Sequence, residues 1–153
     1  MPDSDAARGY LDAAARLNAA TQEWGASAES FSAEAAASTS PPAQQLRSFL
    51  VKFLPLSRDL ALAVRVYQQD VQALPLTTDQ RGIADQLVAK AEIVVEYLER
   101  WTDPDAFAAD MGTSDMGALD QWGGPWLDAT SSVFAEANKL RAALGLPQVD
   151  GGL

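Results

Sequence analysis

The chain has 153 residues, with 21 acidic and 11 basic side chains, and therefore a formal net charge of −10 at pH 7. This charge disfavours binding to nucleic acid or to anionic lipid, because both need a basic surface. Cysteine and histidine are both missing from the sequence, which excludes disulfides, thiolate chemistry and the most common general base and metal ligand. The length and the 48% hydrophobic content are typical of one folded domain.

The first expected helix begins at Ser4 or Asp5, because either side chain can cap its first turn. An apolar seam follows with members spaced alternately four and three residues apart, the pattern of a helix packed against other helices. Half of the seam is small, which lets a neighbouring helix approach closely. The members are Tyr10, Ala14, Leu17, Thr21, Trp24, Ala28, Phe31 and Ala35.

Residues 44–74 form the most apolar stretch and indicate the central helix of the fold. We expect Ser40 to cap this helix, with Pro41 at its first position, where a missing N–H is harmless. Pro55 lies inside the helix and predicts a kink or a break. The helix should end before Pro75. Its seam consists of Leu46, Phe49, Phe53, Leu60, Val64, Tyr67, Val71 and Leu74.

The third expected helix covers residues 78–101 and starts with a capping box formed by Thr77 and Gln80. Asp103 should cap a short helix of about two turns that ends at Met111. Residues 112–124 show the least regular pattern in the sequence.

Within that irregular stretch, Ser114 could cap a helical segment that carries Leu119 and Trp122. Gly123, Gly124 and Pro125 should interrupt this segment. The last helix is then expected from Pro125 to about Leu144. Residues 148–153 are expected to be a flexible tail.

These elements predict an all-α fold, because no apolar alternation of period two occurs. Four long helices with short connections indicate an antiparallel up-down four-helix bundle, with the short extra helix between helices 3 and 4. The single domain should cover residues 1–147. A less regular all-helical arrangement is the alternative.

The acidic side chains between Asp103 and Asp128 do not indicate a metal site. Di-iron bundles need histidine, and a calcium loop needs alternating ligands, a central glycine and a closing glutamate. We therefore expect no metal and no cofactor. The apolar seams contain no acidic residue, so an enzyme that uses carboxylates would have to place them on the surface, where pKa values shift little. This is the least favoured alternative, and a protein without enzymatic activity is expected.

Three arginines, Arg47, Arg58 and Arg65, line the face of the central helix opposite its apolar seam. They could bind an acidic partner. The simpler interpretation is a solvated face that makes weak pairs with neighbouring acids.

The aromatic side chains gather in the half of the bundle where the first and third helices end and the second and fourth begin. Such a cluster forms either a plain core or a pocket, because tryptophan and tyrosine favour places where an apolar body meets a polar rim. The candidate ligand-binding residues are Trp24, Phe53, Trp101, Trp122 and Trp126.

Two short stretches resemble a family of small helical proteins of high-GC Gram-positive bacteria. They are Tyr10-Leu11-Asp12 with Leu17-Asn18-Ala19-Ala20, and Leu74-Pro75 with Asp79, Ile83 and Leu87-Val88. The resemblance covers about two thirds of the chain and implies an exported protein, often a lipoprotein, without an assigned activity. This chain lacks the lipid-carrying cysteine and a signal segment, and it has leucine before Pro75 where tryptophan is common.

The leading hypothesis is a non-enzymatic helical bundle that binds a protein partner or an apolar ligand, outside the cytoplasm if the resemblance holds. The alternative is an intracellular scaffold that self-associates through the small seam of the first helix. Either a monomer or a homodimer fits the sequence, and no transmembrane segment is expected, since no apolar run approaches ~20 residues.

Overall fold

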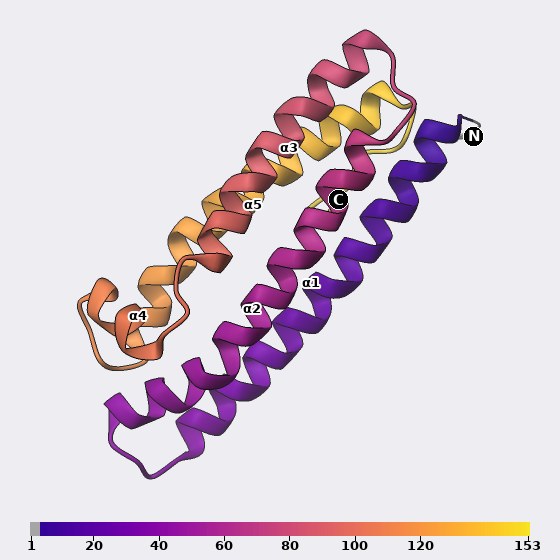
Figure 1. The fold of residues 1–153 in the computed structure, drawn as a ribbon. Helices are drawn as coiled ribbons and strands as arrows, with labels where there is room; N and C mark the ends of the chain where they lie inside the picture. Colours follow the sequence, from indigo (N-terminus) through magenta and orange to yellow (C-terminus); the bar gives the residue numbers. More distant parts are fainter. Residues whose placement is uncertain (1–3) are drawn as a thin grey trace.

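A computed structural model describes residues 4–153, which form five packed α-helices (Figure 1). No strand occurs in the described part of the chain, so the prediction of an all-α fold is confirmed. Residues 1–3, which the predicted domain included, lie outside the described residues. The helices are α1 (Asp5–Ala37), α2 (Pro42–Gln72), α3 (Thr78–Glu99), α4 (Pro104–Met111) and α5 (Gly117–Ala143).

The four long helices make an elongated body (Figure 1). Close backbone contacts join α1 to α2, α2 to α3, and α3 to α5. The short α4 lies near one end of the body and contacts α2 and α5. Within residues 4–153, α1 and α5 have no comparable backbone approach. These two helices are therefore the edges of the packed set, and side chains and the last residues of the chain join them.

Three of the predicted helix starts are confirmed by the capping contacts. The Ser4 hydroxyl accepts a hydrogen bond from the Ala7 amide of α1 at 3.0 Å. At α3, both halves of the capping box between Thr77 and Gln80 are present. Asp103 accepts from the Asp105 amide at 2.9 Å and caps α4. Local sequence chemistry alone determines these three sites.

The starts of α2 and α5 differ from the prediction. Pro41 rather than Ser40 is the N-cap of α2, and Pro42 is the first helical residue. The Ser40 side chain makes no cap; the Gln45 side chain holds this turn by donating to the Ser40 carbonyl. At α5, the carboxylate of Asp115, not Ser114, accepts from the Gly117 amide at 2.9 Å.

The helices α2 and α5 run through Pro55 and Pro125. The expected interruption before Pro125 is therefore wrong, and so is a break at Pro55, whereas the alternative of a kink at Pro55 stays a prediction. Each proline lies on an exposed face, where water can satisfy the carbonyl that loses its partner. In α5 the buried Trp122 stacks on Trp126 across the proline, with ring centroids 5.2 Å apart. Packing on the inner face therefore keeps the helices continuous.

The core follows the small seam of α1 only in part. Ala14 is 2% exposed, as expected for a close helix contact, whereas Ala28 is only half-buried. Among the described residues, no helix combines the length and the apolar character needed to cross a membrane.

Candidate functional site

The structure brings four of the five predicted ligand-binding residues together in one aromatic cluster. The Trp24 ring lies 5.7 Å from Phe53, 6.0 Å from Trp122 and 5.0 Å from Trp126, measured between centroids. Phe53 and Trp122 meet edge to face at 5.4 Å. These separations are those of directly packed rings. The four rings therefore pack against one another, and their role in ligand binding stays a prediction.

The polar edges of this cluster are satisfied within the protein. The Trp24 indole donates to the buried Ser57 hydroxyl at 3.3 Å. Tyr97, whose ring lies 5.1 Å from Trp122, donates its hydroxyl to the Trp122 carbonyl. Burial raises the pKa of Tyr97 to about 12. These bonds fix the orientation of the rings and link α1 to α2 and α3 to α5.

Trp101, the fifth predicted residue, lies apart from the other four. Its ring packs against Phe107 of α4 at 5.0 Å, and its indole donates to Asp110 at 2.9 Å. It reaches the aromatic cluster only through Tyr97. Its packing anchors α4 to the end of α3.

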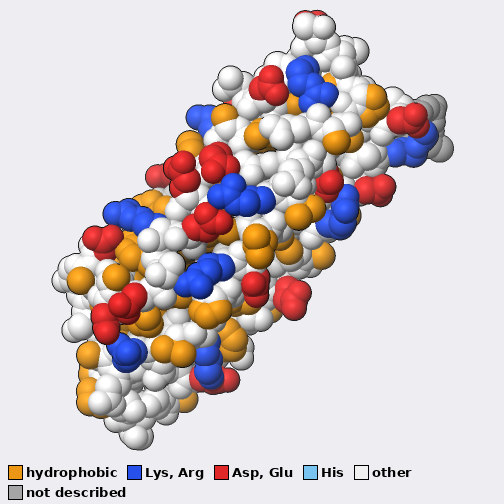
Figure 2. Space-filling model, viewed as in Figure 1, with side chains coloured by type: hydrophobic (Ala, Val, Ile, Leu, Met, Phe, Trp, Pro, Cys, Tyr) orange, Lys and Arg blue, Asp and Glu red, His pale blue; other side chains and the backbone are white. Residues whose placement is uncertain are grey.

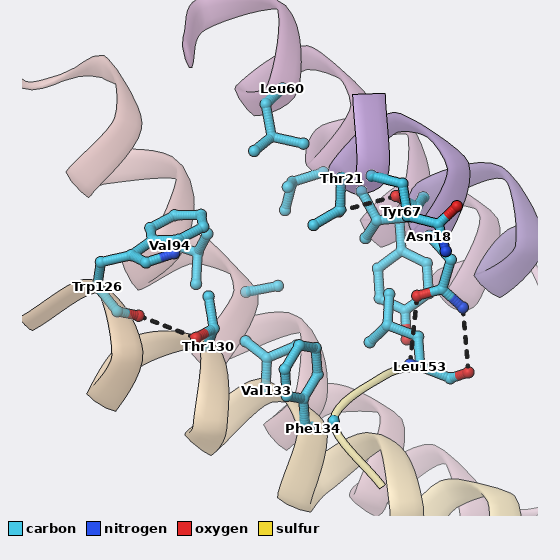
Figure 3. A pocket seen from close by; sticks show the side chains of 15 residues that line it. Asn18, Thr21, Leu60, Tyr67, Val94, Trp126, Thr130, Val133, Phe134 and Leu153 are labelled. Carbon is cyan, nitrogen blue, oxygen red and sulfur yellow. Dashed lines mark hydrogen bonds between the residues drawn. The ribbon is translucent and has the colours of Figure 1, made fainter. Parts of the chain in front are cut away.

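A cavity of about 140 Å³ lies beside the aromatic cluster and is shared by all four long helices (Figure 3). Buried side chains of α2 and α3 form its floor, and α1 and α5 form opposite walls. Trp126 is the one predicted ligand-binding residue that lines it. The floor residues are Leu60, Val64, Tyr67, Ala91 and Val94, and the wall residues are Leu17, Asn18, Thr21, Gln22, Trp126, Thr130, Val133 and Phe134.

The last residues of the chain cover one side of this cavity. We name residues 146–153 the C-terminal strap. Gly151 and Leu153 line the cavity, and Leu153 is only 5% exposed. The sequence predicts a flexible tail for residues 148–153, but the structure places this segment against the helices (Figure 3).

Two asparagines hold the strap by its backbone. The Asn138 side chain of α5 donates to the Val149 carbonyl at 2.8 Å and accepts from the Val149 amide at 3.0 Å. Asn18 of α1 makes the same paired contact with Leu153, with longer distances of 3.5 and 3.4 Å. The strap therefore bridges the two edge helices, which lack close backbone contacts of their own.

Arg141 supports the strap from below and is one of three buried polar side chains in the described chain. Its guanidinium donates to the Pro147 carbonyl at 2.5 Å and to the Leu153 carbonyl at 3.3 Å. A buried cation needs such bonds to offset its lost hydration. The strap thus supplies carbonyl acceptors for the Arg141 guanidinium.

Two buried tyrosines meet at the cavity floor, to which Tyr67 belongs. The hydroxyls of Tyr10 and Tyr67 are 3.2 Å apart and share a hydrogen bond. Burial raises the pKa of both phenols, most strongly that of Tyr67. Neither tyrosine can ionise near neutral pH, so this pair supplies polarity without charge.

The charged side chains on the face shown in Figure 2 mix both signs over the surface. The arginines of α2 take part in this mixture. Arg47 pairs with Asp105 at 2.5 Å, and Arg65 pairs with Glu92 at 3.6 Å and with Glu99 at 3.0 Å. Exposed pairs of this kind contribute little to stability. Residues 4–153 contain no group of three or more acidic side chains placed to hold a metal ion.

Sequence reasoning missed most of the cavity residues. One signal was present: Thr21 is the single polar member of the α1 seam, and it lines the cavity. Thr130, Asn138 and the strap had no comparable pattern, because their positions depend on how α5 lies relative to α1.

Comparison of the chain with known protein families, with curated proteins and with solved structures finds no match. The resemblance to exported helical proteins therefore stays a prediction.

Proposed function

We propose that the protein is an antiparallel four-helix bundle without enzymatic activity, and that it binds a small apolar ligand in the cavity between α1 and α5. The observation that carries this proposal is the cavity itself, which has a buried apolar floor and contributions from all four long helices. An enclosed apolar cavity of about 150 Å³ can bind benzene. The cavity between α1 and α5 has a similar volume, about 140 Å³, and is partly open to solvent.

The chemistry of the lining supports binding rather than catalysis. Tyr67 is the one titratable side chain of the lining, and its hydroxyl is engaged by Tyr10. No aspartate or glutamate side chain belongs to the lining. A site without an ionisable group near neutral pH has no general acid or base to offer.

The scaffold alternative has less support. Self-association through the small seam of α1 would require that seam to be accessible. Its members Ala14 and Leu17 are buried within the single chain, and α1 packs on α2. Light scattering tests this alternative directly: a stable dimer that the Ala14→Leu substitution dissociates would favour the scaffold.

Ligand binding can be tested by titrating the protein with benzene and following its melting temperature. A ligand that binds only the folded state raises the melting temperature in a saturable way. We expect this rise in the parent protein and its loss in Val133→Phe, because the larger side chain occupies the cavity.

The matched control is Leu127→Phe on the same helix, since Leu127 is 64% exposed and lies off the cavity. Circular dichroism checks that each variant stays helical. A parent protein without a saturable shift would contradict the proposed function, and so would equal binding by Val133→Phe.

A further inference from the structure

The cavity lining has a polar side but no charged side chain. Its polar groups are the side chains of Asn18, Thr21, Gln22, Tyr67 and Thr130 and the indole N–H of Trp126, and no lysine, arginine, aspartate or glutamate belongs to it. The Asn18 amide is engaged by Leu153 and the Tyr67 hydroxyl by Tyr10. The two threonines, the Trp126 indole and the exposed Gln22 are left to meet a ligand.

The two threonines belong to different walls of the cavity, Thr21 on α1 and Thr130 on α5 (Figure 3). Each hydroxyl donates its one proton to its own helix. Thr21 donates to the Leu17 carbonyl at 2.9 Å, and Thr130 to the Trp126 carbonyl at 3.0 Å. A hydroxyl oxygen keeps acceptor capacity after its proton is used. Both walls therefore offer hydrogen-bond acceptors next to an apolar floor.

We propose that this site selects an uncharged amphiphile: a short apolar chain or ring that carries a hydroxyl group, which donates a hydrogen bond to the Oγ1 of Thr130 or Thr21. The inference rests on the proposed function and specifies its ligand class. Burying a polar group is favourable only when it finds a partner, and an alcohol supplies the donor that the threonines lack.

An anionic ligand of the same length does not fit this lining. A carboxylate has only acceptors at neutral pH, and it would meet the threonine acceptors inside a protein of net charge −10. The Gln22 amide at the exposed edge and the Trp126 indole N–H are the remaining donors of the lining, and neither carries a positive charge to balance a carboxylate. The buried Arg141 does not line the cavity, and its guanidinium donates to the carbonyls of Pro147 and Leu153.

The test compares the dissociation constants of hexan-1-ol and hexanoate at pH 7.5, with benzene as a reference that cannot form this hydrogen bond. We expect hexan-1-ol to bind at least about tenfold more tightly than hexanoate. The double variant Thr21→Val and Thr130→Val keeps the side-chain shape and removes both oxygens. It should reduce the affinity for hexan-1-ol relative to benzene by roughly three- to tenfold, the range of one net hydrogen bond.

Ser132→Ala is the control, because Ser132 makes the same kind of bond to its own helix, with the Asp128 carbonyl at 3.1 Å, but lies off the cavity. It should leave the affinity ratio unchanged. Saturable benzene binding with equal affinities for alcohol and carboxylate, or an unchanged ratio in the threonine variant, would overturn this inference and leave the proposed function standing. Absence of binding by all three probes would overturn both.

Discussion

The two halves of α1 carry one continuous seam, yet they pack differently. In the first half, Ala6, Ala7, Tyr10, Ala13, Ala14 and Leu17 are all buried, whereas Ala35 is the only buried residue after them. The first half is rich in alanines, which let the helix lie close to its neighbours, and its large ring, Tyr10, is also buried. In the second half, Trp24, Ala28 and Phe31 are only half-buried.

The cavity lies where these two packing regimes meet. Leu17, Asn18, Thr21 and Gln22 of α1 line it, directly after the close-packed alanines and before Trp24. On its far side Trp126 belongs both to the lining and to the aromatic cluster. A cavity is expected at such a junction, because neither small nor large side chains fill the space completely. The following predictions test whether the two halves differ in this way.

The largest effect is expected from Ala14→Leu. Adding three carbons to a 2% exposed site should overpack the seam and lower the free energy of unfolding by about 1–3 kcal/mol. Ala28→Leu, in the half-buried region, should change it by about 0.5 kcal/mol or less. Urea unfolding measures both values. Equal losses in the two variants would show that the halves pack alike.

Alkaline pH should destabilise the fold through all three tyrosines. Each has a pKa above the usual value of 10.0, because burial disfavours the phenolate. A pKa raised on folding gives stability that is complete below pH 10 and is lost as pH rises through the folded value, about 12 for Tyr97. Tyrosinate absorbance should therefore not rise near pH 10 while the protein stays folded. A native titration near pH 10 would show that these phenols are solvated.

Loosening the strap should have a smaller and local effect. Asn138→Ala removes both hydrogen bonds to Val149, at a cost of about 1 kcal/mol. Hydrogen exchange at the Val149 amide should therefore accelerate by roughly fivefold, since a tenfold change corresponds to ~1.4 kcal/mol. The Leu98 amide, in a buried part of α3, serves as the reference. Unchanged exchange at Val149 would mean that the asparagine does not hold the strap.

The smallest expected effect is a gain in stability from Gly25→Ala. Gly25 lies inside α1, and an added Cβ would meet no atom within 4 Å. The substitution should stabilise the protein by about 0.5–1 kcal/mol, since glycine is a poor helix former. Thermal melting shows whether the substitution raises or lowers the stability. A lower melting temperature would indicate that the second half of α1 is packed more closely than the structure shows.

The local elements of the fold could be predicted from the sequence, whereas the site could be predicted only in part. Ser4, the capping box at Thr77 and the cap at Asp103 act over three residues or fewer, so their patterns are visible in the chain. The effect of Pro55 on α2 could not be predicted from the sequence, because it depends on whether the proline lies on the buried or the solvent-exposed face of the helix. The order of the helices was enough to predict that the aromatic side chains gather in one half of the bundle. It was not enough to predict that their rings pack directly against one another.

The cavity and the strap could not be predicted because they arise from contacts between distant segments. Asn18 meets Leu153 across 135 positions, and Asn138 meets Val149 outside any helix. These contacts depend on the side-chain sizes along all four long helices, so no local sequence pattern predicts them.

The binding of an apolar ligand in the cavity between α1 and α5 can be tested by following the methyl resonances of the valines while the protein is titrated with benzene. Val64, Val94 and Val133 line the cavity, while the buried Val71 and Val95 do not. The account predicts saturable shifts for the first three, with a common dissociation constant, and none for the other two. No saturable shift, or shifts confined to the exposed Val51 and Val66, would contradict it.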